Sequence, residues 1–282
     1  MLLQAGIDFR FRVNYDKIII KGLAIPPQEM PMLFQNTPAL FGLFHLGFLA
    51  GITIFNILVY FWFRKLDSGK ILRILQLMGL MMLLAEVWKQ WFCFHYVFGE
   101  SISLWFFPWQ LCSMAMYCSF LLPFLREKYQ NVVLAFLASF SFFAAIMALI
   151  VPSDMLRPQI PLACHGFLYH CFMISESIGA VLILKTRERV RFTPALILFL
   201  LMAAAAEVIN VAGHHILHDI HIEPNMFYIT PYYASTQVVF NSIANALGIL
   251  PEILIYLLLI ILMSYVFFLL LVRRRKKDSA PA

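Results

Sequence analysis

Charged residues are scarce in this chain. They make up 13% of its 282 residues, while hydrophobic residues make up 62%. A soluble domain of ordinary composition is about a quarter charged and about half apolar. This composition therefore excludes an ordinary soluble enzyme. Cysteine is sparse as well, and the odd count of five, in a chain of this composition, argues against a disulfide framework.

What the chain has instead is a set of long apolar stretches. Each reaches the roughly 20 residues that a helix needs to cross the hydrocarbon of a bilayer. They cover residues 38–63, 71–98, 104–125, 131–151, 163–184, 194–217 and 250–272. We therefore predict an all-α fold, a polytopic membrane bundle of seven transmembrane helices within 38–272. The connections between the first six stretches are short, so consecutive helices should pack as antiparallel neighbours.

Positive charge alternates from one connection to the next. Most of the 21 lysines and arginines lie in the segments 64–73, 126–130, 185–193 and 273–282. By the positive-inside rule this pattern predicts an N-terminus outside and a C-terminus in the cytoplasm. Because the basic residues gather at helix ends, they are expected to meet anionic lipid and not nucleic acid. The organisation is typical of a multi-pass protein of a bacterial plasma membrane.

Residues 1–37 form an extracytoplasmic leader in this topology, and 273–282 a basic cytoplasmic tail. The leader has no apolar run of about 7–15 residues near its start, so no cleavable signal peptide is evident. Met30 and Met32 lie just before the first apolar stretch and would also serve as start sites.

Several ionisable groups fall at one depth of the predicted bundle. Cys112 and His170 each lie eight residues from the outer end of their stretch, or about 12 Å at 1.5 Å per residue. Glu207 lies about ten residues from the outer end of its stretch, and Glu86 about twelve. Ionisable groups inside a membrane are costly and usually face the bundle interior. We therefore predict one polar layer in the outer half.

A cysteine beside a histidine can be a catalytic pair. The imidazole takes the thiol proton and leaves a strong nucleophile, which can attack an ester carbonyl and hold the acyl group as a thioester. Cys112 and His170 are the candidates, with Gln110 or Asn210 as donors to the oxyanion. The alternative is that Cys112 is a small core filler and His170 an interhelical hydrogen-bonding residue.

Glu86 and Lys89 are three residues apart on one helix face and can neutralise each other as a structural ion pair. Glu207 and Asn210 share a face of the sixth stretch. Together with Gln110, the side chains of Glu86, Glu207 and Asn210 are candidate substrate-binding groups in an outward-facing pocket.

A second cluster of polar residues follows the sixth stretch, with His214, His215, His218, Asp219, His221 and Glu223. His214 and His218 are separated by one helical turn, a workable spacing for metal ligands. No other cluster supplies an obvious third and fourth ligand, so we predict neither a metal nor a cofactor. The loop 218–249 that contains part of this cluster is long and rich in aromatic residues, which suits a cap over the pocket.

Four short segments together resemble the YwaF family of integral membrane proteins, which extends to animal transmembrane protein 164. They are Phe-Gly-Leu-Phe-His (41–45), Pro-Trp-Gln-Leu-Cys-Ser (108–113), His-Gly-Phe-Leu-Tyr-His (165–170) and Asn-Met-Phe-Tyr-Ile-Thr-Pro-Tyr-Tyr (225–233). The resemblance implies a helical bundle, and the animal member is an acyltransferase that remodels ether phospholipids through a cysteine nucleophile. It would place the nucleophile at Cys112 and its partner at His170. One difference is Ser113, where the animal pattern has histidine.

Three functions remain open on the sequence. The leading hypothesis is acyl transfer or ester hydrolysis on membrane lipids, with Cys112 as nucleophile and His170 as base. A non-enzymatic transporter or lipid-binding protein could use the same pocket. A metal-dependent membrane enzyme could use the histidines.

Overall fold

The computed structural model describes residues 37–98, 103–152, 154–188, 190–216 and 224–272, and all regular secondary structure within these ranges is helical. This confirms the all-α fold class for the described part of the chain. The predicted tail, and the predicted leader except Thr37, lie outside the described residues.

Within the described ranges, six helices are long and apolar enough to cross a membrane, as in a multi-pass membrane protein. Four of them are regular: α1 (Leu43–Phe63), α6 (Ile160–Leu184), α7 (Phe192–Ile216) and α9 (Ile249–Leu271). The other two contain a π-helical turn, a local widening of the helix. The first is α2 (Ser68–Phe92), which continues through Cys93–Val97; the second joins α4 (Glu127–Phe136) to α5 (Phe142–Ile150) through Leu137–Ser141.

The third predicted stretch, 104–125, is not one helix. It consists of a 3-10 turn (Leu104–Phe106), the non-helical residues 107–113, the short helix α3 (Met114–Leu121) and a second 3-10 turn (Leu122–Phe124). Pro108 explains the break, because it has no backbone N–H to donate and it disfavours helical geometry at the preceding residue. Phe107 accordingly has φ −56° and ψ 132°.

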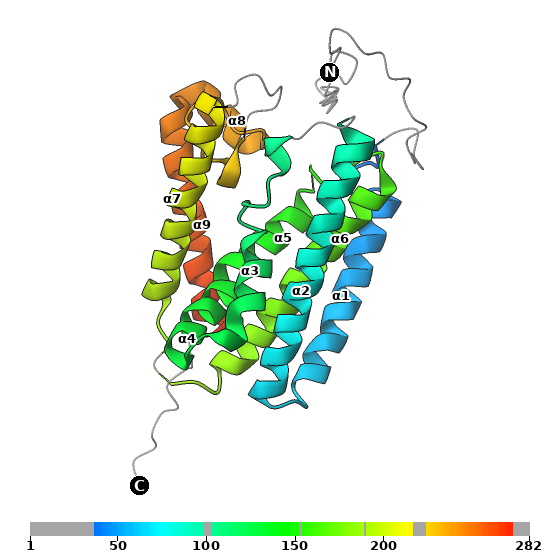
Figure 1. Ribbon diagram of the computed structural model, residues 1–282, viewed down its shortest axis with the longest axis vertical. Coiled ribbons are helices and arrows are strands. Elements are labelled where there is room, and N and C mark those ends of the chain that lie inside the picture. Colours follow the sequence, from blue (N-terminus) through cyan, green and yellow to red (C-terminus); the bar gives the residue numbers. More distant parts are fainter. Residues whose placement is uncertain (1–36, 99–102, 153, 189, 217–223, 273–282) are drawn as a thin grey trace, which may run out of the picture.

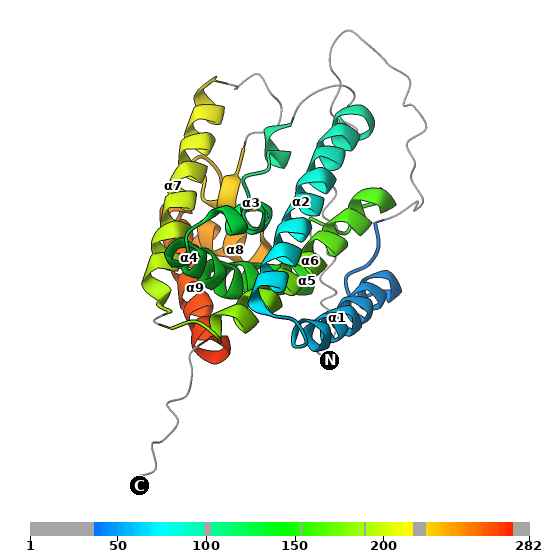
Figure 2. The same ribbon diagram turned by 60° about the horizontal axis from the view of Figure 1, so that its bottom comes forward.

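Helix α6 lies at the centre of the bundle and packs against α1, α2, α4 and α5 (Figure 1). In its most apolar window 72% of residues are buried, against 17% in α1. Figure 2 shows α1 at the edge of the bundle beside α6. His45 also links α1 to α5, because its Nε2 donates to the carbonyl oxygen of Leu149 at 2.8 Å. Most of the α1 surface is thus left to face lipid.

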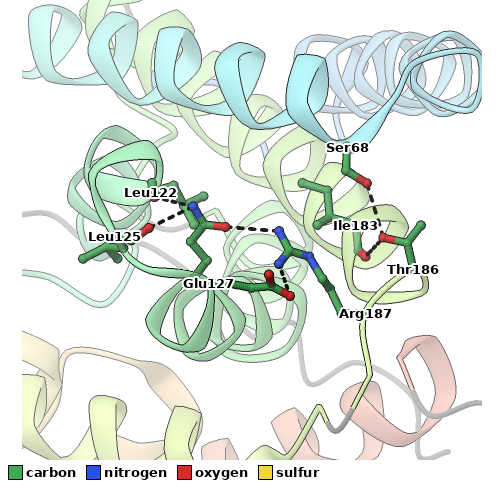
Figure 3. A network of polar contacts seen from close by, with 8 residues as sticks. Ser68, Leu122, Leu125, Glu127, Ile183, Thr186 and Arg187 are labelled. Atoms are coloured by element: carbon green, nitrogen blue, oxygen red, sulfur yellow. Dashed lines mark hydrogen bonds and ion pairs between the residues drawn. The ribbon is translucent and has the colours of Figure 1, made fainter.

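The basic residues of three connections gather at one end of the bundle, which is the lower end in Figure 1. We call this the basic end and define it by residues 64–67, 125–126 and 185–188. Figure 3 shows how polar contacts fasten it. Arg187, just after α6, forms an ion pair with Glu127 at the start of α4 and donates to Gln130 Oε1 at 3.2 Å. Gln130 in turn donates to two carbonyl oxygens, those of Leu122 and Leu125.

Candidate functional site

The candidate site is built around the non-helical residues 107–113. Non-helical backbone at membrane depth is tolerated only where it is buried in protein or lines a cavity, because lipid offers no hydrogen bonds. The freed carbonyl groups here have protein partners. Gln90 Nε2 donates to the Phe106 oxygen at 2.5 Å, and the Tyr117 hydroxyl donates to the Pro108 oxygen at 3.0 Å. These bonds hold the segment inside the bundle.

Gln110 and Asn210 hold a second segment without α-helix, residues 224–235, which contains the 3-10 turn Met226–Tyr228. Gln110 Nε2 donates to the Asn225 oxygen at 2.9 Å, and Gln110 Oε1 accepts from the Phe227 N–H at 2.9 Å. Asn210 Oδ1 accepts from the Met226 N–H at 2.6 Å, and Asn210 Nδ2 donates to the Met226 oxygen at 3.1 Å. The two amides thus bind backbone as a pair of clamps.

The clamped segment is strained as well as buried. Phe227 and Tyr228 both have φ 58°, a left-handed conformation that is uncommon for bulky residues. Phe227 is 1% exposed, and its ring lies 6.1 Å from that of Phe199 on α7. Strained backbone of this kind persists only where the surroundings fix it, and the bonds from Gln110 and Asn210 do so.

The hydroxyl of Tyr228 donates to Asp154 Oδ2 at 2.5 Å. Burial, and then the neighbouring Asp154 carboxylate, raise the pKa of this phenol well above its usual value, so it stays protonated and able to donate. The bond joins the clamped segment to the connection between α5 and α6. After the clamped segment the chain continues into α8 (Val238–Leu247), which packs on α9.

The predicted ion pair between Glu86 and Lys89 is present on α2. Lys89 Nζ lies 2.7 Å from Glu86 Oε1, and both side chains are largely buried. Gln90 Nε2 donates to the same carboxylate oxygen at 2.7 Å. The carboxylate is therefore held by a charge and by an amide, which is what a buried anion requires.

Cys112 lies on the non-helical segment 107–113, within electrostatic reach of this ion pair. Lys89 and Glu86 are close enough for their charges to act on its thiol, and the thiol is close enough to act on Tyr169 of α6. The Tyr169 hydroxyl is buried, and no hydrogen-bond partner for it exists among the described residues. A buried phenol within electrostatic reach of the cysteine thus has a hydroxyl available as a donor.

His170 faces the same polar layer from α6. Its Nδ1 lies 2.7 Å from the carbonyl oxygen of Gly166, which can only accept, so Nδ1 carries the proton. In the neutral ring Nε2 then has the lone pair that a general base needs. Lys89 and His165 are both close enough to act electrostatically with His170. In the described part of the chain, no hydrogen bond joins this ring to Cys112.

The structure divides the predicted site residues into two groups. Glu86 pairs with Lys89 on α2, and the charge of Lys89 reaches both Cys112 on the non-helical segment and His170 on α6. Glu207 lies on the α7 side, where its Oε2 accepts from Asn210 at 3.3 Å. Gln110, two residues before Cys112, connects the two groups.

Both candidate oxyanion donors are already engaged. The two hydrogens of the Asn210 amide go to Met226 and Glu207, and the Gln110 amide donates to Asn225. Their observed role is to position residues 225–227. Oxyanion donation by either side chain stays a prediction. Asn210 would first have to release one of its bonds, whereas Gln110 has a second N–H besides the one that bonds Asn225.

The histidine cluster is only partly within the described residues. His214 stacks on Tyr232 with ring centroids 3.6 Å apart, and His215 Nε2 is 3.1 Å from the Tyr232 hydroxyl. The remaining members, from His218 to Glu223, lie outside the described residues. Within the described ranges no three histidine, cysteine or acidic side chains converge as they would around a metal.

Three residues of the site were missed by the sequence reasoning, and only one of them, Gln90, carried a signal that could have been used. Gln90 is one helical turn after Glu86, a spacing at which an amide reaches a carboxylate. Tyr169 directly precedes His170 and was missed, because a tyrosine in an apolar stretch carries no signal of its own. Asn225 could not have been foreseen, because its partner Gln110 is 115 residues away.

Comparisons with known proteins add no information about the function of this site. No family model, curated protein or solved structure matches this chain. The resemblance to the YwaF family therefore stays a prediction.

Proposed function

We propose that this chain is a membrane-embedded enzyme that transfers or hydrolyses acyl groups of membrane lipids, with Cys112 as its nucleophile. The observation that carries the proposal is the break in the third stretch. It leaves a thiol within electrostatic reach of a buried ion pair, and of a buried phenol that has no hydrogen-bond partner among the described residues. Polar groups inside a membrane bundle are costly and are commonly functional. A family likeness to YwaF proteins is part of the same proposal.

The chemistry follows from the groups around the thiol. His170 Nε2 takes the proton of Cys112, and the thiolate attacks the carbonyl carbon of a lipid ester. The Tyr169 hydroxyl donates to the oxyanion that forms. When the ester C–O bond breaks, the leaving alcohol takes the proton from His170, and a thioester remains. His170 Nε2 then takes the proton of an acceptor alcohol or water as its oxygen attacks the thioester carbonyl. The C–S bond breaks, a new ester or a free fatty acid leaves, and the proton passes from His170 to the sulfur and restores the thiol. Closing the Cys112 to His170 contact is part of this proposal, since such contacts tighten when substrate binds.

The purified protein in vesicles should turn over a phospholipid with a labelled acyl chain, releasing it or passing it to a second lipid. Tyr169→Phe removes only the hydroxyl, and we expect it to slow turnover by about 100-fold, the effect of losing one oxyanion donor. Thin-layer chromatography of the labelled lipids measures this. Tyr129→Phe is a matched control, because Tyr129 is exposed at the start of α4.

An intact labelled lipid after prolonged incubation would favour the second candidate, a lipid-binding or transporting protein without chemistry. A specific feature supports that alternative, namely an apolar hollow of about 570 Å³ lined by α1, α5 and α6. Bound but unaltered lipid is the result that this alternative predicts.

The orientation is also a proposal. We place the basic end in the cytoplasm, the N-terminus outside, and the whole chain in a bacterial plasma membrane. In this arrangement the partly helical segment Leu104–Phe124 is the third of seven membrane crossings. Its apolar helical part, Met114–Phe124, is too short to cross alone.

A reporter fused after Ala282 should be cytoplasmic, and one inserted next to Pro224 should be external, because fifteen basic residues favour one side. Enzymatic reporters that are active on only one side of the membrane measure this. An external C-terminus would contradict the orientation and would put the Cys112 layer in the inner half.

A further inference from the structure

A groove runs along the lipid-facing side of the bundle. Its upper part is the hollow of about 570 Å³, and a second hollow of about 160 Å³ adjoins it. Tyr60, Phe142 and Ile178 line both hollows. The second hollow reaches Lys185, at the basic end. We call the two together the α1 groove.

The walls of the α1 groove are apolar apart from a few groups. Asn56 is the main polar side chain in it, and its hydrogen bonds are already made within the protein. Its Nδ2 donates to the Ile52 oxygen at 3.0 Å, and its Oδ1 accepts from the Ser175 hydroxyl at 2.7 Å. A polar ligand would find little to bind here, whereas a hydrocarbon chain fits the lining.

Two cations flank the mouth of the groove at the basic end. Lys185 lines the lower hollow from the end of α6. The guanidinium of Arg64, at the end of α1, lies over the Tyr60 ring at 5.7 Å from its centroid. Each wall of the mouth thus carries one basic side chain.

We propose that the α1 groove binds an anionic phospholipid of the leaflet at the basic end. One acyl chain occupies the hollows, and the phosphate lies between Arg64 and Lys185. Hydrocarbon alone gives no selectivity, because a chain in the groove and a chain in the bilayer are both surrounded by apolar groups. The selectivity for an anionic lipid comes from charge, because basic side chains at the end of a membrane bundle attract anionic headgroups.

This site is separate from the proposed catalytic layer. None of the residues that line the two hollows is among the side chains around Cys112. Lipid binding in the α1 groove therefore does not depend on acyltransferase activity, and an experiment can contradict either proposal without contradicting the other.

The test uses the full-length protein in phosphatidylcholine vesicles with a trace of phosphatidylglycerol that carries a photoreactive group in one acyl chain. After illumination, mass spectrometry should find the label on peptides of α1, α5 and α6 around Asn56, Ile146 and Ile178. Unlabelled phosphatidylglycerol should suppress it, and added phosphatidylcholine should not. Labelling spread evenly over the exposed faces of α7 and α9, or equal competition by both lipids, would overturn the proposal. Crosslinks between two copies of α1 would do the same, because a second copy would then fill the groove.

Two sets of variants separate the headgroup from the chain. Arg64→Gln with Lys185→Gln should reduce groove labelling roughly three- to tenfold. Lys128→Gln with Arg191→Gln removes the same charge from exposed positions of the same end, and should leave labelling unchanged. Ile178→Trp should fill the groove and displace the label even where the cations are intact. Equal labelling in the two double variants would show that bulk charge, and not this mouth, attracts the lipid.

Discussion

Replacing Cys112 with serine is expected to lower lipid turnover by at least about 100-fold while the protein remains folded. A serine hydroxyl is similar in size to the thiol but far less readily deprotonated by a neutral imidazole. Because Cys112 is only partly buried and its thiol makes no hydrogen bond among the described residues, the free energy of unfolding should change by about 1 kcal/mol or less. Transfer of a labelled acyl chain, protein yield and melting temperature together measure the two effects.

Cys118→Ser is the matched control. Cys118 lies on α3 and is 5% exposed, six residues further along the chain than Cys112. This variant makes the same replacement of sulfur by oxygen at a position outside the proposed site. Lipid turnover should therefore persist, and only the free energy of unfolding should fall. Equal turnover in the two variants would remove Cys112 from the mechanism and leave the lipid-binding alternative ahead.

Asn210→Ala is expected to have the largest effect on stability, a loss of about 2–4 kcal/mol. The buried amide is the partner of both the N–H and the carbonyl of Met226, and an orphaned buried polar group costs about 1–3 kcal/mol. The strained residues 227 and 228 would then lose one of their two clamps. Thermal unfolding of the purified protein measures the loss.

Asn245→Ala provides the comparison, because this asparagine is exposed on α8 and bonds only to Asn241. Its effect should stay within about 0.5 kcal/mol. If Asn210→Ala is as mild as Asn245→Ala, the segment 224–235 is held by its apolar contacts and the clamp has no energetic role.

Long apolar runs were sufficient to predict the six long helices, but not α8, which lies within the predicted loop 218–249. The first, fifth, sixth and seventh stretches correspond to α1, α6, α7 and α9, with ends that differ by a few residues. Hydrophobicity predicts them well because the membrane requires each span to satisfy its own backbone. The third stretch is where this reasoning failed, because Pro108 breaks the helix while the composition stays apolar.

The same break limits what could be predicted of the site. The depth of Cys112 was derived from 1.5 Å per residue, which holds only in a helix, and residues 107–113 are not helical. The Glu86–Lys89 contact was predictable because it is local to one helix. The clamps of Gln110 and Asn210 were not, because they join segments 115 and 16 residues apart through backbone atoms, for which sequence gives no pattern.

The most direct test of the proposed chemistry is mass spectrometry of the intact protein after brief incubation with its membrane lipids and rapid acid quenching. We predict an added mass equal to one acyl chain, located on the peptide that contains Cys112 and removed by neutral hydroxylamine, as expected of a thioester. The adduct should be absent from Cys112→Ser and present in Cys118→Ser. An unmodified Cys112, in protein that is turning over lipid at the same moment, would contradict covalent catalysis at this thiol.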